Sequence, residues 1–169
     1  MDVDESFMEV ALAQAERALV AGEFPVGCVI VSQGEVVAVG ERRNSVSANE
    51  LDHAEMNALR TLLAQGQPAD MEKLVVYSTM EPCLMCYSAL IVNGVRNIVY
   101  AYEDAMGGGT SLPLSQLAPL YAGIRMNIRP HVLRARSLRL FQQFFSRPQP
   151  YLQDSLLCRY TLGQTSTLP

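Results

Sequence analysis

The sequence predicts an α/β fold, a three-layer α-β-α sandwich in which helices cover both faces of a mixed five-stranded sheet. Three observations lead to this class. Apolar runs rich in β-branched residues alternate along the chain with segments whose apolar residues recur at helical spacing. Apolar residues make up 49% of the chain and charged residues 18%, which is typical of a globular protein. The length of 169 residues suits one domain with a single hydrophobic core.

The first half of the chain predicts a helix, a hairpin and a second helix. Residues 5–20 carry apolar side chains at helical spacing. Two apolar runs, over 26–31 and 36–39, are separated by a glycine-bearing turn and predict a β-hairpin. A polar loop over 40–52 then leads into a helix over 53–65, which we expect to stop before a Gly-Gln-Pro sequence.

The second half continues this alternation. In order, we expect a buried strand, a helix, a strand, a short helix, an edge strand and a last helix, over residues 74–79, 83–92, 97–102, 114–121, 126–133 and 135–145. Pro130 assigns the last strand to an edge, because proline cannot donate to a central ladder. Residues 161–169 are expected to form a disordered tail, so the predicted domain spans residues 1–160.

Composition also bears on the compartment. The N-terminus begins Met1-Asp2-Val3-Asp4-Glu5, which is acidic and unlike a secretory signal. No apolar run approaches the length needed to cross a bilayer. Four cysteines, two of them in C-x-x-C spacing, fit metal binding better than a disulfide framework. We therefore expect a cytoplasmic protein that does not interact with membranes.

Charge is distributed unevenly along the chain. The net charge is −4, and residues 1–122 hold six Lys and Arg against sixteen Asp and Glu. Residues 123–169 instead hold a single acid, Asp154, and seven arginines: Arg125, Arg129, Arg134, Arg136, Arg139, Arg147 and Arg159. Because arginine binds phosphate in a bidentate manner, this segment is compatible with nucleic acid or another polyanion. The alternative is that these arginines pair with acidic groups of the same or a neighbouring subunit.

Two short stretches predict a metal site. His53-Ala54-Glu55 is followed by Pro82-Cys83-Leu84-Met85-Cys86, in which Cys83 lies thirty residues after the histidine. Histidine and cysteine are the preferred ligands of zinc, and a catalytic zinc site keeps three protein ligands and an open position for water. Cys83 and Cys86, at i and i+3, project from one face of a helix. We therefore expect His53, Cys83 and Cys86 to bind one Zn²⁺ per chain.

Two structural interpretations compete with a catalytic zinc. One is a closed zinc site that only stabilises the fold, which would need a fourth Cys or His ligand. The candidates are Cys28, Cys158 and His131, and none of them lies at ligand spacing. The other is that no metal binds and the thiols are core residues. Cys28 lies in an apolar strand and is expected to be buried, and His131 is expected to be structural or at the surface.

Glu55 favours the catalytic interpretation. It lies two residues beyond His53, where its carboxylate can act on the water of the metal without binding the metal itself. Zinc lowers the pKa of bound water toward neutrality, and the pattern H-x-E…P-C-x-x-C is the signature of zinc-dependent nucleobase deaminases. The predicted chemistry is hydrolytic deamination of an amino-bearing heterocycle, with Glu55 as the proton shuttle.

These motifs resemble the cytidine/deoxycytidylate deaminase superfamily, and within it most closely the bacterial tRNA-specific adenosine deaminases. The supporting segments are Glu23-Phe24-Pro25-Val26-Gly27, Asn44, Asp104-Ala105 with the glycine loop Gly107-Gly108-Gly109, and Phe144-Phe145. The resemblance implies a cytidine deaminase-like fold and conversion of adenosine to inosine at the wobble position of tRNA. It also implies that Val26 and Asn44 contact the nucleoside, and that the protein is a homodimer that binds tRNA.

Two other functions remain open at this point. The loop between Asn44 and His53 and the glycine loop are shorter than in the family the chain resembles, and substrate contacts would lie there. The first alternative is a deaminase of a free base, nucleoside or nucleotide of guanine, cytosine or cytidine type. The second is a catalytically silent zinc subunit that binds RNA, although Glu55 is present.

Overall fold

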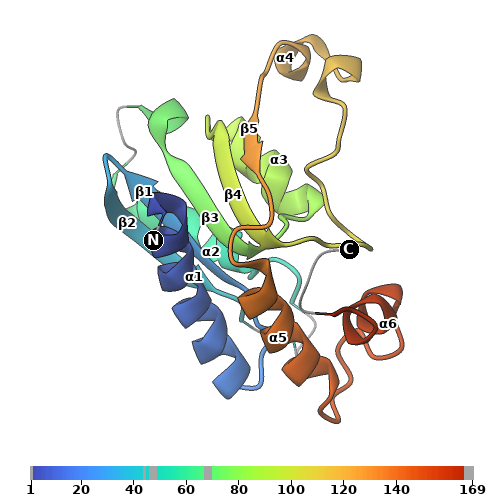
Figure 1. The fold of residues 1–169 in the computed structure, drawn as a ribbon. Helices are drawn as coiled ribbons and strands as arrows, with labels where there is room; N and C mark the ends of the chain where they lie inside the picture. The colour runs from blue at the N-terminus through green and yellow to red at the C-terminus, as the bar shows by residue number, and fades with distance from the viewer. Residues whose placement is uncertain (1, 44, 46–48, 67–69, 166–169) are drawn as a thin grey trace.

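The structure is a computed structural model that describes residues 2–43, 45, 49–66 and 70–165. Five strands form one sheet in the order β2-β1-β3-β4-β5 (Figure 1). They are β1 (Gly27–Ser32), β2 (Glu35–Glu41), β3 (Val75–Met80), β4 (Asn97–Tyr102) and β5 (Asn127–Arg129). β1 runs antiparallel to β2 and β3, while β3, β4 and β5 are parallel. The predicted mixed five-stranded sheet is therefore confirmed.

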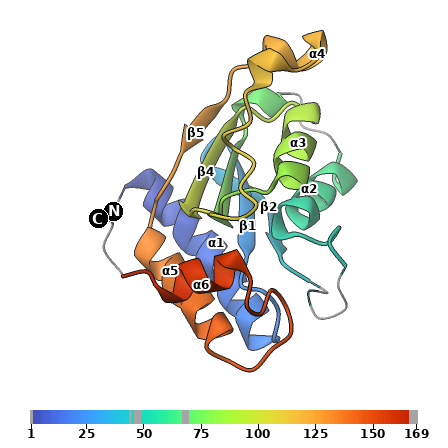
Figure 2. The same ribbon diagram turned by 90° about the vertical axis from the view of Figure 1, so that its right-hand side faces the viewer.

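Helices cover both faces of this sheet, as predicted (Figure 2). One layer contains α1 (Val3–Val20) and α5 (Arg134–Phe145), and the other contains α2 (Ala54–Ala64) and α3 (Leu84–Val92). Buried side chains from both layers and from the sheet form one hydrophobic cluster. This packing rigidly supports the starts of α2 and α3, where the candidate site lies.

The β1–β2 hairpin has the tight turn that its sequence suggested. Gln33 and Gly34 connect the paired residues Ser32 and Glu35, and both have positive φ angles, 51° and 83°. Positive φ at both central residues matches the twist of the two strands, and glycine adopts it without strain.

Near the C-terminal half, three elements differ from the prediction. The edge strand β5 ends at Arg129, because Pro130 has no N–H to donate and His131 and Leu133 take positive φ angles. His131 consequently lies in a turn, partly exposed, with its Nε2 3.5 Å from Glu103. The helix expected over 114–121 is divided into a 3₁₀ turn, Leu114–Gln116, and α4 (Pro119–Ala122), which begins at Pro119.

The third difference is a helix that the sequence did not predict, α6 (Leu156–Leu162), which packs against α5. Ser155 caps it by accepting a hydrogen bond from the N–H of Cys158. Thr161 is buried in this helix, which ends at Leu162, so the start of the segment expected to be a disordered tail is helical. The rest of that expectation concerns residues 166–169, which lie outside the described residues.

In the described part of the chain, no helix has both the length and the apolar character required to span a bilayer. The longest helix, α1, carries acidic side chains in its first turn and a basic one in its last.

Candidate active site

The candidate site forms where two helices begin side by side. His53 is the N-cap residue of α2, Cys83 is the N-cap of α3, and Cys86 lies in the first turn of α3. The sequence predicted that these helices begin at His53 and Cys83, one residue earlier than they do. Helices α2 and α3 contact each other on the same face of the sheet (Figure 2), and their starts bring the three side chains together.

The three side chains have the geometry of a zinc site. The Nδ1 atom of His53 lies 3.5 Å from the Sγ atoms of both Cys83 and Cys86. All three ligand atoms lie within 4.8 Å of one another. A tetrahedral zinc with usual bond lengths separates nitrogen from sulfur by roughly 3.6 Å, so the observed spacing fits this ion.

No fourth ligand joins this cluster among the described His, Cys, Asp and Glu side chains. Cys28 is fully buried in β1, as expected, and Cys158 is buried in α6. All four cysteines are free thiols. A site with three protein ligands leaves one position of a tetrahedral zinc for water, which is the arrangement of catalytic sites.

The charges of the cluster are strongly coupled. The hydrogen bond from the Cys86 thiol lowers the pKa of Cys83 to about 4, with help from His53 and against the effect of burial. The same contact with Cys83, together with burial, raises the pKa of Cys86. Burial lowers the pKa of His53, but the contacts with Cys83, Glu55 and Glu50 outweigh it and raise the pKa. Binding of zinc by both sulfurs requires both thiols to be deprotonated, so zinc affinity depends on pH.

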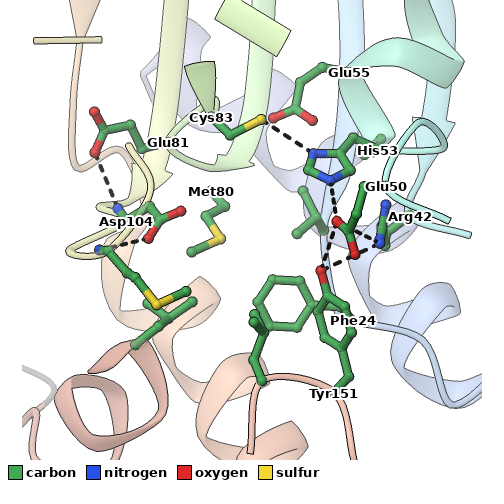
Figure 3. A pocket seen from close by; sticks show the side chains of 15 residues that line it. Phe24, Arg42, Glu50, His53, Glu55, Met80, Glu81, Cys83, Asp104 and Tyr151 are labelled. Atoms are coloured by element: carbon green, nitrogen blue, oxygen red, sulfur yellow. Dashed lines mark hydrogen bonds and ion pairs between the residues drawn. The ribbon is translucent and has the colours of Figure 1, made fainter. Parts of the chain in front are cut away.

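Glu55 lies in the first turn of α2, on the cluster side of the cavity (Figure 3). Its side chain is 3% exposed, and its Oε1 atom accepts a hydrogen bond of 2.8 Å from the hydroxyl of Ser78, in β3. Burial raises the pKa of Glu55, although the nearby His53 opposes this effect. A carboxyl group whose pKa is shifted toward neutrality can both accept and donate a proton.

A cavity of about 190 Å³ opens beside the cluster (Figure 3). This volume is below the roughly 300–1,000 Å³ typical of sites for drug-sized ligands, and it suits a single flat heterocycle. Val26, predicted to contact substrate, lies in its wall, whereas Asn44 lies outside the described residues. Other lining side chains include Phe24, Arg42, Glu50, Met80, Glu81, Asp104, Met106, Tyr151, Leu152 and Leu157.

Several of these lining residues were not identified from the sequence. Glu50 lies three residues before His53, a spacing that could have drawn attention to it, and its Oε2 is 3.1 Å from Nε2 of His53. Burial opposes the shift, but this contact and the charge of Arg42 lower the pKa of Glu50. Tyr151 belongs to the segment after α5, in which the sequence contains no motif that would identify a site residue.

Part of the arginine-rich segment is occupied by ion pairs within the chain. Arg129 pairs with Asp2 and Asp4, Arg136 with Glu9 and Glu16, and Arg134 with Glu103. Three of the seven arginines therefore neutralise acidic groups, and two of the three pair with acids of α1 or its N-cap. Phe144 and Phe145 are likewise buried, and both rings pack against Phe24. These contacts favour the second interpretation of the charge pattern, pairing within the subunit.

Comparison with known proteins gives consistent results. Residues 1–102 match the family model described as the cytidine and deoxycytidylate deaminase zinc-binding region. A tRNA-specific adenosine deaminase of Streptococcus pyogenes is 30% identical over 149 residues, which cover 88% of this chain and 94% of that protein. The enzyme of the same description from Aquifex aeolicus is 33% identical over 105 residues, covering 62% and 70%.

Solved structures resemble the fold. One, from studies of A-to-I editing by tRNA:A34 deaminases at the wobble position, superimposes with a TM-score of 0.65 at 26% identity, covering 74% of this chain and 96% of that one. A guanine deaminase from Nitrosomonas europaea gives a TM-score of 0.68 at 22% identity, covering 83% of both chains. At that level of identity, the second likeness concerns the fold alone.

Proposed function

Because the chain belongs to the family of the cytidine and deoxycytidylate deaminase zinc-binding region, we propose that it is a zinc-dependent hydrolase that converts adenosine to inosine at the wobble position of tRNA. The observation that carries this proposal is the cluster of His53, Cys83 and Cys86 beside the buried Glu55, at the wall of a base-sized cavity. The relatives described as tRNA-specific adenosine deaminases support the choice of substrate.

We assign the metal to His53 Nδ1 and to the Sγ atoms of Cys83 and Cys86, with one Zn²⁺ per chain. Zinc bound at this position supplies hydroxide at neutral pH, because it lowers the pKa of a water ligand. The two helix N-termini direct backbone N–H groups toward the cluster, which favours the thiolate forms of the cysteines.

Glu55 moves the protons of the reaction. Its carboxylate takes a proton from the attacking water and passes it to N1 of the purine as oxygen adds to C6. It then transfers the second proton of the water to the amino group, which leaves as ammonia, and inosine remains. The hydrogen bond from Ser78 holds Oε1 of Glu55, so that Oε2 is the oxygen available for these transfers.

The cavity admits the base between its polar and aromatic walls. Phe24, Val26 and Tyr151 line the cavity, and Phe24 and Tyr151 lie across it from Glu81 and Asp104 (Figure 3). A flat heterocycle packs well against aromatic and branched side chains. We assign Val26 to this contact and retain Asn44 as a second nucleoside contact on the basis of the family resemblance.

A free base, nucleoside or nucleotide is the second candidate substrate. One observation favours it: the pairing of Arg129, Arg134 and Arg136 with acidic groups of the same chain. Arginines in such pairs are less available to phosphates of RNA.

Parallel incubations distinguish the two substrates. The purified zinc protein is mixed with unmodified tRNA carrying adenosine at the wobble position and, separately, with guanine, cytosine, adenosine and cytidine compounds, and ammonia release is followed. The proposal expects inosine in the tRNA and none of this activity in Glu55→Ala. Deamination of a free base, nucleoside or nucleotide without reaction on tRNA would refute the tRNA substrate and support the small-molecule substrate. A silent subunit would show neither activity while binding RNA.

We also propose a homodimer and a cytoplasmic location. The homodimer rests on the family resemblance alone, whereas the relatives named tRNA-specific adenosine deaminases and the free state of all four cysteines support the cytoplasmic location. Light scattering at micromolar concentration tests the first, and a single monomeric species would contradict it.

A further inference from the structure

Glu50 connects the candidate metal ligand to a part of the chain that the family motifs do not reach. A single oxygen, Oε2, lies 3.1 Å from Nε2 of His53, 3.3 Å from Nη2 of Arg42 and 3.2 Å from the hydroxyl of Tyr151 (Figure 3). These three partners come from the start of α2, the end of β2 and the segment between α5 and α6.

The contact with Glu50 determines which nitrogen of His53 is free for the metal. An ionised carboxylate only accepts hydrogen bonds, so Nε2 carries the proton and donates it to Glu50. Nδ1 is then unprotonated, and this is the atom that faces Cys83 and Cys86 at 3.5 Å. Carboxylates that orient a metal-binding imidazole in this way also raise its basicity as a ligand.

Glu50 needs support to hold this position, because its side chain is 57% exposed. Arg42 supplies part of it: the guanidinium is 2% exposed and donates from Nη2 to both Glu50 and the hydroxyl of Tyr151. The ring of Tyr151 lies over this guanidinium at 5.6 Å and packs on Phe24 at 5.4 Å. Tyr151 therefore ties the C-terminal segment to the carboxylate that touches His53.

We propose that Glu50 is a positioning residue for His53 and that Tyr151 holds Glu50 in place, so that the C-terminal segment contributes to zinc affinity. This inference rests on the zinc site of the proposed function. It does not depend on which substrate the enzyme deaminates.

Zinc competition with a chromogenic chelator tests the proposal on the full-length zinc protein, with the melting temperature of each variant measured with and without metal. Glu50→Ala should weaken zinc binding by about 10- to 100-fold. Glu50→Gln keeps an acceptor but loses the charge, so its loss should be smaller. Tyr151→Phe removes one hydroxyl and should weaken zinc binding by about fivefold, the effect of one hydrogen bond.

Tyr160→Phe is the matched control. It deletes the same atom from the same region of the chain, but that hydroxyl donates to Glu103, away from the cavity. This variant should bind zinc as the wild type does. Wild-type zinc affinity in both Glu50 variants would overturn the proposal, as would equal effects of Tyr151→Phe and Tyr160→Phe. If Glu50→Ala fails to fold, Glu50→Gln decides, because its amide still accepts from Arg42.

The outcomes also separate this inference from the proposed function. Weakened zinc binding in the Glu50 variants, combined with no reaction on tRNA, would support the positioning role and refute the substrate. A wild-type protein that binds no zinc would refute both.

Discussion

Gly40 lies where β2 passes directly beneath the start of α2, the helix that carries His53 and Glu55. A Cβ atom placed on Gly40 would lie 2.1 Å from the carbonyl oxygen of Ala54 and 2.5 Å from the backbone nitrogen of Ala58. Both contacts are with helix backbone, which cannot rotate away as a side chain can. The substitution Gly40→Ala must therefore displace α2.

The size of this displacement follows from the contact distances. Few real Cβ contacts are shorter than 3.4 Å, so the 2.1 Å contact requires a movement of roughly 1.3 Å, the difference between the two values. A shift of about 1 Å in catalytic groups can cost roughly 100-fold in rate. Because α3 does not contact β2 in this way, Cys83 and Cys86 would not follow His53. We expect zinc affinity and activity to fall together, with about 1–3 kcal/mol lost from the free energy of unfolding through overpacking.

Zinc competition, ammonia release and urea unfolding measure these three quantities. Gly27→Ala is the matched control, since its Cβ would meet the backbone of Ala11 and Ala15 in α1 at 2.1 and 2.5 Å, on the opposite face of the sheet. It should cost similar stability but leave zinc affinity nearly intact. Gly123→Ala, with nothing within 4 Å of the added atom, should behave as the wild type. If Gly40→Ala binds zinc and reacts normally, helix placement does not control the site.

Three other predictions concern single groups. Glu55→Gln should lower the deamination rate by about 10²- to 10⁴-fold while zinc content stays near that of the wild type, because the group transfers protons and is not a ligand; metal analysis that showed lost zinc would contradict this role. Removal of zinc by a chelator should lower the melting temperature, and Cys83→Ser should show a smaller drop because its metal site is already weakened. Burial by itself would raise the pKa of Glu103, but the hydrogen bond from Arg134 outweighs burial and lowers this pKa below its ordinary 4.5. The ion pair therefore stabilises the fold above about pH 4.5, and this stabilisation is lost as the pH falls through the lowered pKa. Glu103→Gln should accordingly cost about 3 kcal/mol at pH 7, because Arg134 is left buried without a charged partner, and the difference from wild type should shrink on acidification; a difference independent of pH would argue against the ion pair.

The metal cluster could be predicted because its information is local. H-x-E and P-C-x-x-C each lie at the start of a helix, and the alternation of strands and helices predicted that both helices pack on one sheet. The pattern predicted a mixed sheet with an edge at Pro130, but it left the order of the strands open. Local spacing thus identified the candidate ligands and Glu55 before any three-dimensional information.

Contacts between distant segments could not be predicted in the same way. Tyr151 reaches Glu50 across 101 residues of chain, after an irregular stretch in which Leu152 and Asp154 adopt positive φ angles. Such backbone angles in residues other than glycine leave no mark in a periodic pattern. Helix α6 has seven residues, too few to be stable without its packing on α5, so propensity alone gave no reason to expect it.

The pairing of acidic α1 with the arginines has a practical consequence for truncated proteins. Residues 1–22 contain five acids and one arginine, so their removal would change the net charge from −4 to zero. It would also release Arg129 and Arg136 from Asp2, Asp4, Glu9 and Glu16. Since α1 also covers the hydrophobic core, retention of such a fragment on heparin would report the deleted helix and not a natural RNA-binding surface.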